Sequence, residues 1–219
     1  MIANLTTGAA FVDELLQQNE PIMSKLDADP GPGTASNMGA LIKAALKNEM
    51  EAADVAALWV ASAPEIDVKL ALAQHAGDEA RHYVLVADKA QKMGLDLTGF
   101  DPLDPPSPVL EFLRTLNASV ERVAAALVTR EAMGARRNIQ FLKFLEANKY
   151  DGLVKLYRDI INPDEERHHR IGCELLAKLA TTAEDQQRAR SAASRLLEIG
   201  DRMRDGFLQK TGASVMPGC

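Results

Sequence analysis

Cysteine, aromatic residues and long apolar runs are all scarce in this sequence. Its 219 residues include only two cysteines, Cys173 and Cys219, so no disulfide framework is expected and a reducing compartment fits. Aromatic residues make up 5% of the chain. No stretch approaches the roughly 18 consecutive apolar residues that a membrane-spanning helix needs. We therefore expect a soluble, cytoplasmic protein without a membrane span.

The sequence also lacks a secretory signal and an excess of basic residues. The opening segment, MIANLTTGAAFVDELLQQ, has no basic region, and Asp13 and Glu14 interrupt its apolar residues, so no signal peptide is expected. The formal net charge is −6, which argues against a broad nucleic-acid-binding surface. This charge disfavours tRNA as a partner, although it is compatible with a local basic patch.

Residues that favour α-helices are abundant instead. The chain is 47% hydrophobic and 26% charged, as is typical of a globular protein long enough to bury one sizeable core. Ala, Leu, Glu, Lys, Arg and Gln dominate, and apolar residues recur mostly at helical spacing without sustained alternation. The sequence predicts an all-α fold in a single domain, residues 1–219.

Proline and glycine divide the chain into six predicted helical stretches. These cover about 7–27, 37–62, 65–93, 108–147, 150–180 and 183–210. Ser107 and Pro108 form a start signal for the fourth stretch, whose length suggests a bend or break. Pro163 lies inside the fifth, so we expect a kink or restart there, with Asn162 as a possible cap. The tail after Gly212 is expected to be disordered.

The connections indicate how the central helices pack. The second and third stretches are joined by a short turn, as are the fourth and fifth, whereas the Pro-rich segment 94–108 is long. Two helical hairpins joined by one long crossover predict a four-helix bundle within about residues 37–180. The stretches 7–27 and 183–210 would flank this core as N-terminal and C-terminal helices.

Each of the four central stretches has a glutamate on its apolar face, and two of them add a histidine one turn later. These residues are Glu49, Glu79, His82, Glu131, Glu165 and His168. In the fourth stretch, for example, the apolar face is formed by Val120, Ala124, Leu127, Val128, Glu131, Ala135 and Leu142. Carboxylates therefore occupy positions where a helical core normally places aliphatic side chains.

Four carboxylates facing one another in a core need positive charge nearby. An unpaired ionised carboxylate is costly to bury, and the four would also repel one another. Two divalent transition-metal ions would balance four carboxylates, and Glu and His at i, i+3 can reach one centre. A single Glu-x-x-His is more often a solvated or intrahelical pair, but two such units with two further glutamates in phase predict a two-metal site.

The two Glu-x-x-His units belong to a longer repeated motif, DEARH at 78–82 and DEERH at 164–168. With Glu49 and Glu131, the sequence resembles the ferritin-like di-iron carboxylate superfamily, whose pattern is E…ExxH…E…ExxH over four helices. The extended motif is similar to that of bacterial multicomponent monooxygenases. The resemblance covers about residues 37–180 and implies a ferritin-like four-helix bundle with one long crossover.

By this resemblance the six residues would bind two iron ions, with manganese or a mixed iron and manganese pair as alternatives. One ion would be bound by Glu49 and His82 and the other by Glu131 and His168, and the bridging carboxylates would be Glu79 and Glu165.

The resemblance also implies a supporting role for the Asp and Arg residues of the repeated motif. Asp78 and Asp164 would accept hydrogen bonds from ligand histidines across the bundle, and Arg81 and Arg167 would balance their charge. In the alternative interpretation, each Asp pairs with the Arg three residues later on a solvated helix face.

Four neighbouring residues compete for places in the site. Glu51 lies about 200° further round its helix than Glu49, so Glu49 is preferred. Glu166 and His169 form another i, i+3 pair, but the parallel between the two motifs favours the pair one position earlier. His75, one turn before the first motif, could reach the pocket as a further supporting or substrate-binding group.

The resemblance implies oxygen chemistry. The leading hypothesis is a non-haem di-iron oxidase or monooxygenase that activates O₂, oxidises a small organic substrate and takes electrons from an external donor, as a monomer or homodimer. tRNA-modifying hydroxylases belong to this class. The alternatives are a ferroxidase or a rubrerythrin-like enzyme that detoxifies peroxide or iron, and a non-enzymatic metal-binding bundle. The chain has no Cys-x-x-Cys pair, so a rubredoxin module is not expected.

Overall fold

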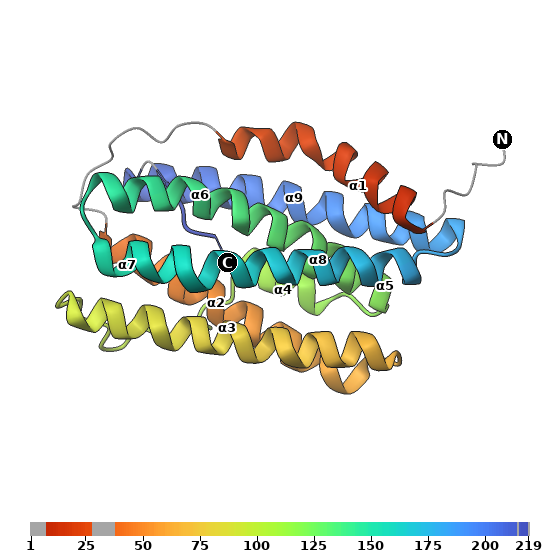
Figure 1. Cartoon of the computed structure of the whole chain (residues 1–219), viewed down its shortest axis with the longest axis horizontal. Helices are drawn as coiled ribbons and strands as arrows, with labels where there is room; N and C mark the ends of the chain where they lie inside the picture. The colour runs from red at the N-terminus through yellow and green to blue at the C-terminus, as the bar shows by residue number, and fades with distance from the viewer. Residues whose placement is uncertain (1–7, 28–37, 214, 219) are drawn as a thin grey trace.

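The computed structural model of the chain describes residues 8–27, 38–213 and 215–218. Within these ranges the regular structure is helical and contains no strand, which confirms the predicted all-α class (Figure 1). In chain order the elements are α1 (Gly8–Met23), η1 (Ser24–Asp27), α2 (Met38–Ser62), α3 (Ile66–Lys92), α4 (Pro108–Arg114), α5 (Ser119–Arg122), η3 (Val123–Arg130), α6 (Glu131–Ala147), α7 (Asp151–Leu156), η4 (Tyr157–Ile161), α8 (Asn162–Leu179) and α9 (Ala183–Thr211).

The helices α2 and α3 form a hairpin and pack against each other along their length (Figure 1). The backbone N–H of Ala63 donates to the carbonyl of Trp59 at the end of α2. Glu65 then has extended backbone angles, φ −82° and ψ 131°, and serves as the N-cap of α3. Pro64 lies between them and cannot donate a helical hydrogen bond. The two predicted stretches therefore match these helices to within a residue.

The long connection after α3 is attached to α2 by polar contacts. The Lys47 ammonium donates to the carbonyls of Pro102, at 2.9 Å, and Pro105, at 2.7 Å. The Glu51 carboxylate accepts hydrogen bonds from the backbone N–H and hydroxyl of Ser107. The Ser107 hydroxyl oxygen also accepts from the N–H of Leu110, which confirms the predicted N-cap of α4.

The predicted stretch 108–147 is broken, as its length suggested. Residues 115–118 separate α4 from α5, after which α5, η3 and α6 continue one into the next. Both η3 and η4 are π-helical, and such turns are frequent at functional sites. The segment η3 ends immediately before the predicted ligand Glu131, and η4 ends shortly before the predicted ligand Glu165.

Pro163 lies in the first turn of α8, immediately after the π-helical turns of η4. The helix runs on without a break from η4 into α8, so Pro163, which has no N–H to donate, lies within a continuous helix and does not begin a new one. Asn162 has helical backbone angles, φ −58° and ψ −42°. The predicted capping role of Asn162 is therefore wrong, because a cap residue lies outside the helical region of φ and ψ.

Two further helices cover the side of the molecule opposite α2 and α3. The first, α1, packs on α8 and α9, and α9 packs on η3 and α5 (Figure 1). Pro21 lies within α1 and does not interrupt it. The buried side chains of α1 and α9 include Phe11, Leu15 and Leu196. These residues extend the apolar core on the far side of η3 and α8.

The C-terminal tail is ordered and buried where the structure describes it, contrary to the prediction of disorder. The side chains of Val215 and Met216 are 4% and 8% exposed. The Gly218 N–H donates to Asn138 Oδ1 at 2.9 Å. Asn48 Nδ2 donates to the carbonyl of Pro217 at 3.1 Å. The tail has no periodic pattern, so its burial depends on the surface formed by α2 and α6 and could not be predicted from its own residues.

Among the described helices, none has both the length and the apolar character required to cross a membrane.

Candidate metal centre

The six predicted ligands converge on one place in the interior, and His75 joins them. Their carboxylate and imidazole atoms form two groups that share Glu79, and within each group the atoms lie within 4.8 Å of one another. The first group is Glu49, Glu79, His82 and Glu165, and the second is His75, Glu79, Glu131 and His168. All seven side chains are at most 3% exposed.

The first group surrounds the Nδ1 atom of His82. That nitrogen lies 3.4 Å from an oxygen of Glu49, 3.7 Å from one of Glu79 and 3.7 Å from one of Glu165. These residues come from α2, α3 and α8. Because Glu79 and His82 are three residues apart, both side chains lie on the same face of α3.

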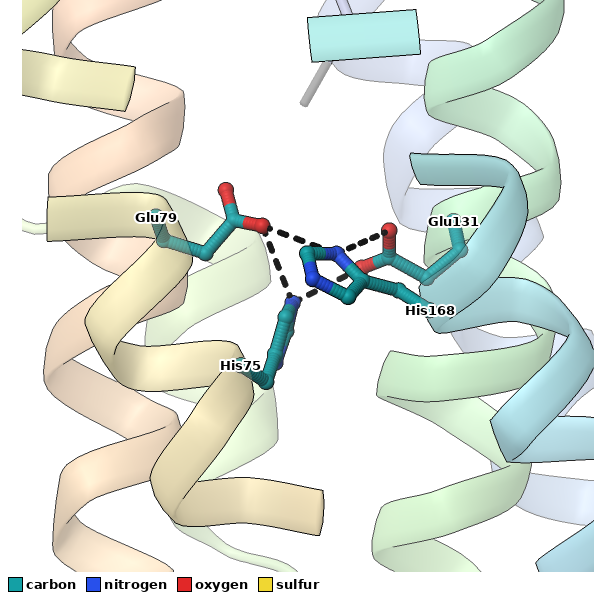
Figure 2. A group of neighbouring side chains, drawn as sticks. All are labelled: His75, Glu79, Glu131 and His168. Carbon is teal, nitrogen blue, oxygen red and sulfur yellow. Dashed lines mark ion pairs between the residues drawn. The ribbon is translucent and has the colours of Figure 1, made fainter. Parts of the chain in front are cut away.

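The second group is shown in Figure 2, with His75 and Glu79 projecting from α3 toward Glu131 and His168. The Nδ1 atom of His168 lies 3.1 Å from Glu79 Oε1 and 3.6 Å from Glu131 Oε2. The Nε2 atom of His75 lies 3.3 Å from Glu79 Oε1 and 3.1 Å from Glu131 Oε1. Two imidazoles therefore face the same two carboxylates.

A close approach of α8 to η3 allows the two sides of the cluster to meet. A Cβ atom at Gly172 would lie 2.5 Å from the carbonyl oxygen of Leu127, so only glycine fits at this contact. Leu127 lies one turn before Glu131, and Gly172 lies one turn after His168. The glycine therefore helps to set the distance between these two predicted ligands.

The buried face of α6 differs in part from the predicted one. The regular spacing predicted that Ala135 and Leu142 would continue the buried face after Glu131, but both are only partly buried. Phe141 and Phe144 are buried instead. Leu142 still packs against the core, so the predicted face is fully buried at Glu131 and only partly buried at Ala135 and Leu142.

The repeated Asp and Arg residues connect the two halves of the cluster. The Nε2 atom of His82 lies 3.0 Å from Asp164, and the Nε2 atom of His168 lies 3.2 Å from Asp78. Each contact joins α3 to α8. With its proton on Nε2, each histidine donates to an aspartate and keeps Nδ1 directed at the glutamates.

The arginines of the motif also bridge α3 and α8. Arg81 donates to Asp164, and Arg167 donates to Asp78 at 2.7 Å. Arg167 also contacts Asp164 on its own helix at 2.7 Å, whereas Arg81 lies 3.9 Å from Asp78. The sequence left two arrangements open, one with contacts across the bundle and one with Asp–Arg pairs within a helix. The structure contains contacts of both kinds.

Three of the competing residues, Glu51, Glu166 and His169, lie outside the cluster. Glu51 is buried but binds Ser107 of the crossover. Glu166 is exposed. The Nδ1 atom of His169 lies 2.9 Å from the carbonyl of Val128, where it can satisfy an acceptor of the π segment, and its Nε2 lies 3.6 Å from Cys173 Sγ.

Burial and mutual charge shift the titration of the cluster. Burial raises the pKa of Glu49 to about 8, against the opposing contact with His82. Burial alone would lower the pKa of His82, but contacts with Glu49 and Glu79 raise that pKa to about 11. Burial would also lower the pKa of His168, which contacts with Glu131 and Glu79 raise to about 10. Contacts with the glutamates therefore favour the protonated form of both imidazoles.

The pKa values of Glu165 and Glu131 are shifted in opposite directions. Burial raises the pKa of Glu165 well above its usual range, and the charges of Glu131 and Glu79 raise it further. Burial would also raise the pKa of Glu131, but the neighbouring His75 and His168 lower it to about 2. Such divergent values arise where several carboxylates share one buried site.

The donor set fits divalent metal ions because many of its buried polar atoms make no well-directed hydrogen bond. Among the described residues, the buried atoms without a well-directed hydrogen bond include both carboxylate oxygens of Glu49, Glu131 and Glu165 and the Nδ1 atoms of His82 and His168. Buried polar atoms are rarely left without a hydrogen bond. Carboxylate and imidazole groups are ligands of iron and manganese in proteins.

Comparison of the chain with protein-family models, with curated proteins and with solved structures finds no match.

Sequence reasoning placed His75 near the site but did not define its contacts. Its position four residues before Glu79 was a usable signal, since residues i and i+4 share one face of a helix. The π segments η3 and η4 had no recognisable signal in the sequence.

Proposed function

We propose that the chain is a ferritin-like four-helix bundle that binds two iron ions and acts as a non-haem oxidase or monooxygenase. The observation behind this proposal is the buried cluster of four glutamates and facing imidazoles, in which the oxygens of Glu49, Glu131 and Glu165 and the Nδ1 atoms of His82 and His168 make no well-directed hydrogen bond to the described residues. The long crossover between α3 and α4 supports the ferritin-like arrangement. Manganese or a mixed pair would suit the same ligands.

The two overlapping groups support a division of the ligands between two ions. Glu49 and His82 would hold one ion, and Glu131 and His168 would hold the other. Glu79 belongs to both groups, which supports its role as a bridge. Glu165 faces His82 and interacts electrostatically with Glu131, so it would be the second bridge.

Reduced iron at this centre would supply electrons to O₂ for the oxidation of a small organic substrate, and an external donor would restore the reduced state. The protein's own residues would hold and shield the centre. The glutamates would neutralise its charge, and Asp78 and Asp164 would fix the orientation of His168 and His82. Burial of every ligand would exclude bulk water.

Complete burial of the centre also favours one alternative. Without movement of the helices, only a very small substrate could reach ligands that are at most 3% exposed. A ferroxidase, for which Fe(II) itself is the substrate, meets this condition, whereas an oxidase of organic molecules must open a path to the centre. The two proposals therefore differ in the fate of iron and oxygen.

Anaerobic loading with Fe(II), followed by exposure to O₂, tests the proposal. We expect about two iron ions per chain, and we expect the double variant Glu79→Ala, Glu165→Ala to bind none tightly. A single round of O₂ consumption that leaves soluble protein with two bound ferric ions supports the oxidase. Continuous oxidation of added Fe(II) into a ferric mineral, or a large oligomeric shell, supports the ferroxidase. A folded wild type that binds no iron contradicts both.

The same experiment separates an enzyme from a metal-binding structural bundle. A purely structural centre would bind its metal but would not react with O₂ after loading with Fe(II). The Glu51→Ala variant provides a matched control, because Glu51 is buried on the same helix as Glu49 but contacts the crossover instead of the cluster.

A further inference from the structure

His75 is buried as deeply as the predicted ligands, at 2% exposure, and it faces the same carboxylates. Its Nε2 atom lies 3.1 Å from Glu131 Oε1 and 3.3 Å from Glu79 Oε1 (Figure 2). Neither ring nitrogen makes a well-directed hydrogen bond to any residue in the described ranges. A buried histidine without such a partner, aimed between two carboxylates, is suited to binding a metal ion.

The helix geometry explains why His75 reaches the centre. His75, Glu79 and His82 are spaced at i, i+4 and i+7 on α3, and these positions share one helix face. The imidazole of His75 lies edge-on to that of His168, with ring centroids 4.6 Å apart and an interplanar angle of 73°. Both rings direct a nitrogen at Glu79 Oε1, at 3.3 Å and 3.1 Å.

His75 differs from the other two histidines of the cluster in its outer partner. His82 and His168 direct Nδ1 inward, and their Nε2 atoms contact Asp164 and Asp78. His75 directs Nε2 inward, and its Nδ1 has no comparable carboxylate among the described residues. The repeated motif therefore accounts for two of the imidazoles, and the third breaks the symmetry between the two halves.

We propose that His75 is a seventh metal ligand, which makes the two ion positions chemically unequal. This inference rests on the proposed two-metal centre. One ion would have two imidazoles, His75 and His168, with Glu131, and the other would have His82 with Glu49. An additional imidazole in place of oxygen donors favours later transition metals such as cobalt over manganese. The position that includes His75 should therefore select its ion differently from its neighbour.

Proton NMR of the protein loaded with Co(II) tests this directly. Each imidazole bound to Co(II) gives a strongly shifted, solvent-exchangeable ring N–H signal. We expect three such signals in the wild type, from His75, His82 and His168, and two in the His75→Gln variant. The His169→Gln variant is the matched control and should keep all three, because His169 contacts the Val128 carbonyl outside the cluster.

Calorimetric titration with Co(II) provides the second measurement. The wild type should bind two ions, and His75→Gln should weaken one binding step by more than the roughly 10-fold to 100-fold that loss of a ligand's outer partner costs. The other step should change much less, and His169→Gln should resemble the wild type.

The outcomes separate this inference from the proposed function. Two bound Co(II) ions with only two shifted N–H signals in the wild type would overturn the role of His75 while leaving the two-metal centre intact. Failure of the folded wild type to bind two ions would overturn both proposals. The signal count in the wild type needs no variant, so it stays decisive if His75→Gln does not fold.

Discussion

The Nε2 atom of His82 on α3 lies 3.0 Å from Oδ2 of Asp164 on α8. The reciprocal contact joins His168 on α8 to Asp78 on α3. Each copy of the repeated motif therefore orients the histidine of the other copy. The same five-residue pattern on two facing helices therefore supplies each histidine with an aspartate from the opposite helix.

Replacing Asp164 by Asn should weaken metal binding without unfolding the protein. The change removes the negative charge that His82 and Arg81 face. Loss of an outer partner of a ligand histidine typically costs about 10-fold to 100-fold in metal affinity. Competition with a chelator of known affinity measures the change.

The control for this prediction is Asp159→Asn. This substitution removes the same charge, but from an exposed position on η4. Its metal affinity should stay within about twofold of the wild type, in keeping with the small effects of most surface substitutions. Equal losses in both variants would show that net charge, and not the contact with His82, determines the affinity.

Removal of metal should make stability fall as the pH rises. In the chain alone, the pKa of Glu49 is raised to about 8 and that of His168 to about 10. The folded state then holds more protons than the unfolded state above pH 4.5 for Glu49 and above pH 6.5 for His168. Stability is therefore lost as the pH rises toward the folded-state pKa values, by about 1.4 kcal/mol per pH unit for each extra proton.

Thermal unfolding of chelator-treated protein at pH 6, 7, 8 and 9 measures this effect. Protein loaded with Mn(II) should show a much weaker decline over the same range, because bound metal replaces the protons at the carboxylates and imidazoles. A melting temperature of the chelator-treated protein that rises from pH 6 to pH 9 would contradict the prediction.

The convergence of the six buried residues could be predicted from the sequence because helical phase is a local property. Glu49, Glu79 and Glu165 fall at regular intervals among apolar residues of single helices, so the pattern alone indicates that they face inward. The turn between α2 and α3 was equally evident from Pro64 and the residues around it.

The other features depend on contacts between distant segments. The close approach of α8 to η3 joins Gly172 to Leu127, two residues far apart in sequence. The burial of Val215 requires the surfaces of α2 and α6, and His75 becomes a cluster residue only because Glu131 lies opposite it. No periodicity within one segment could indicate these relationships.

Gly172→Ala should destabilise the protein by about 1–3 kcal/mol, as overpacking in a core commonly does. The new methyl group would overlap the Leu127 backbone, which cannot move like the end of a flexible side chain.

Gly77→Ala is the matched control, because a Cβ atom there meets nothing within 4 Å on the exposed face of α3. That change should stabilise the helix by about 0.5–1 kcal/mol. Urea unfolding of both variants measures the difference, and equal stabilities would contradict the close approach of α8 and η3.

Met216→Ala should destabilise the protein, because the side chain of Met216 is buried in the docked tail. Met216 is 8% exposed, and truncation of a buried methionine costs about 2–5 kcal/mol in a well-packed core. We expect a value near 2 kcal/mol, because the tail can partly relax around the lost volume.

The matched control is Met93→Ala, since Met93 is 36% exposed at the end of α3. Urea unfolding should show a change of less than about 0.5 kcal/mol for this control. If both methionine variants have wild-type stability, the tail contributes no packing to the folded protein and the surface between Asn48 and Asn138 must be covered in another way.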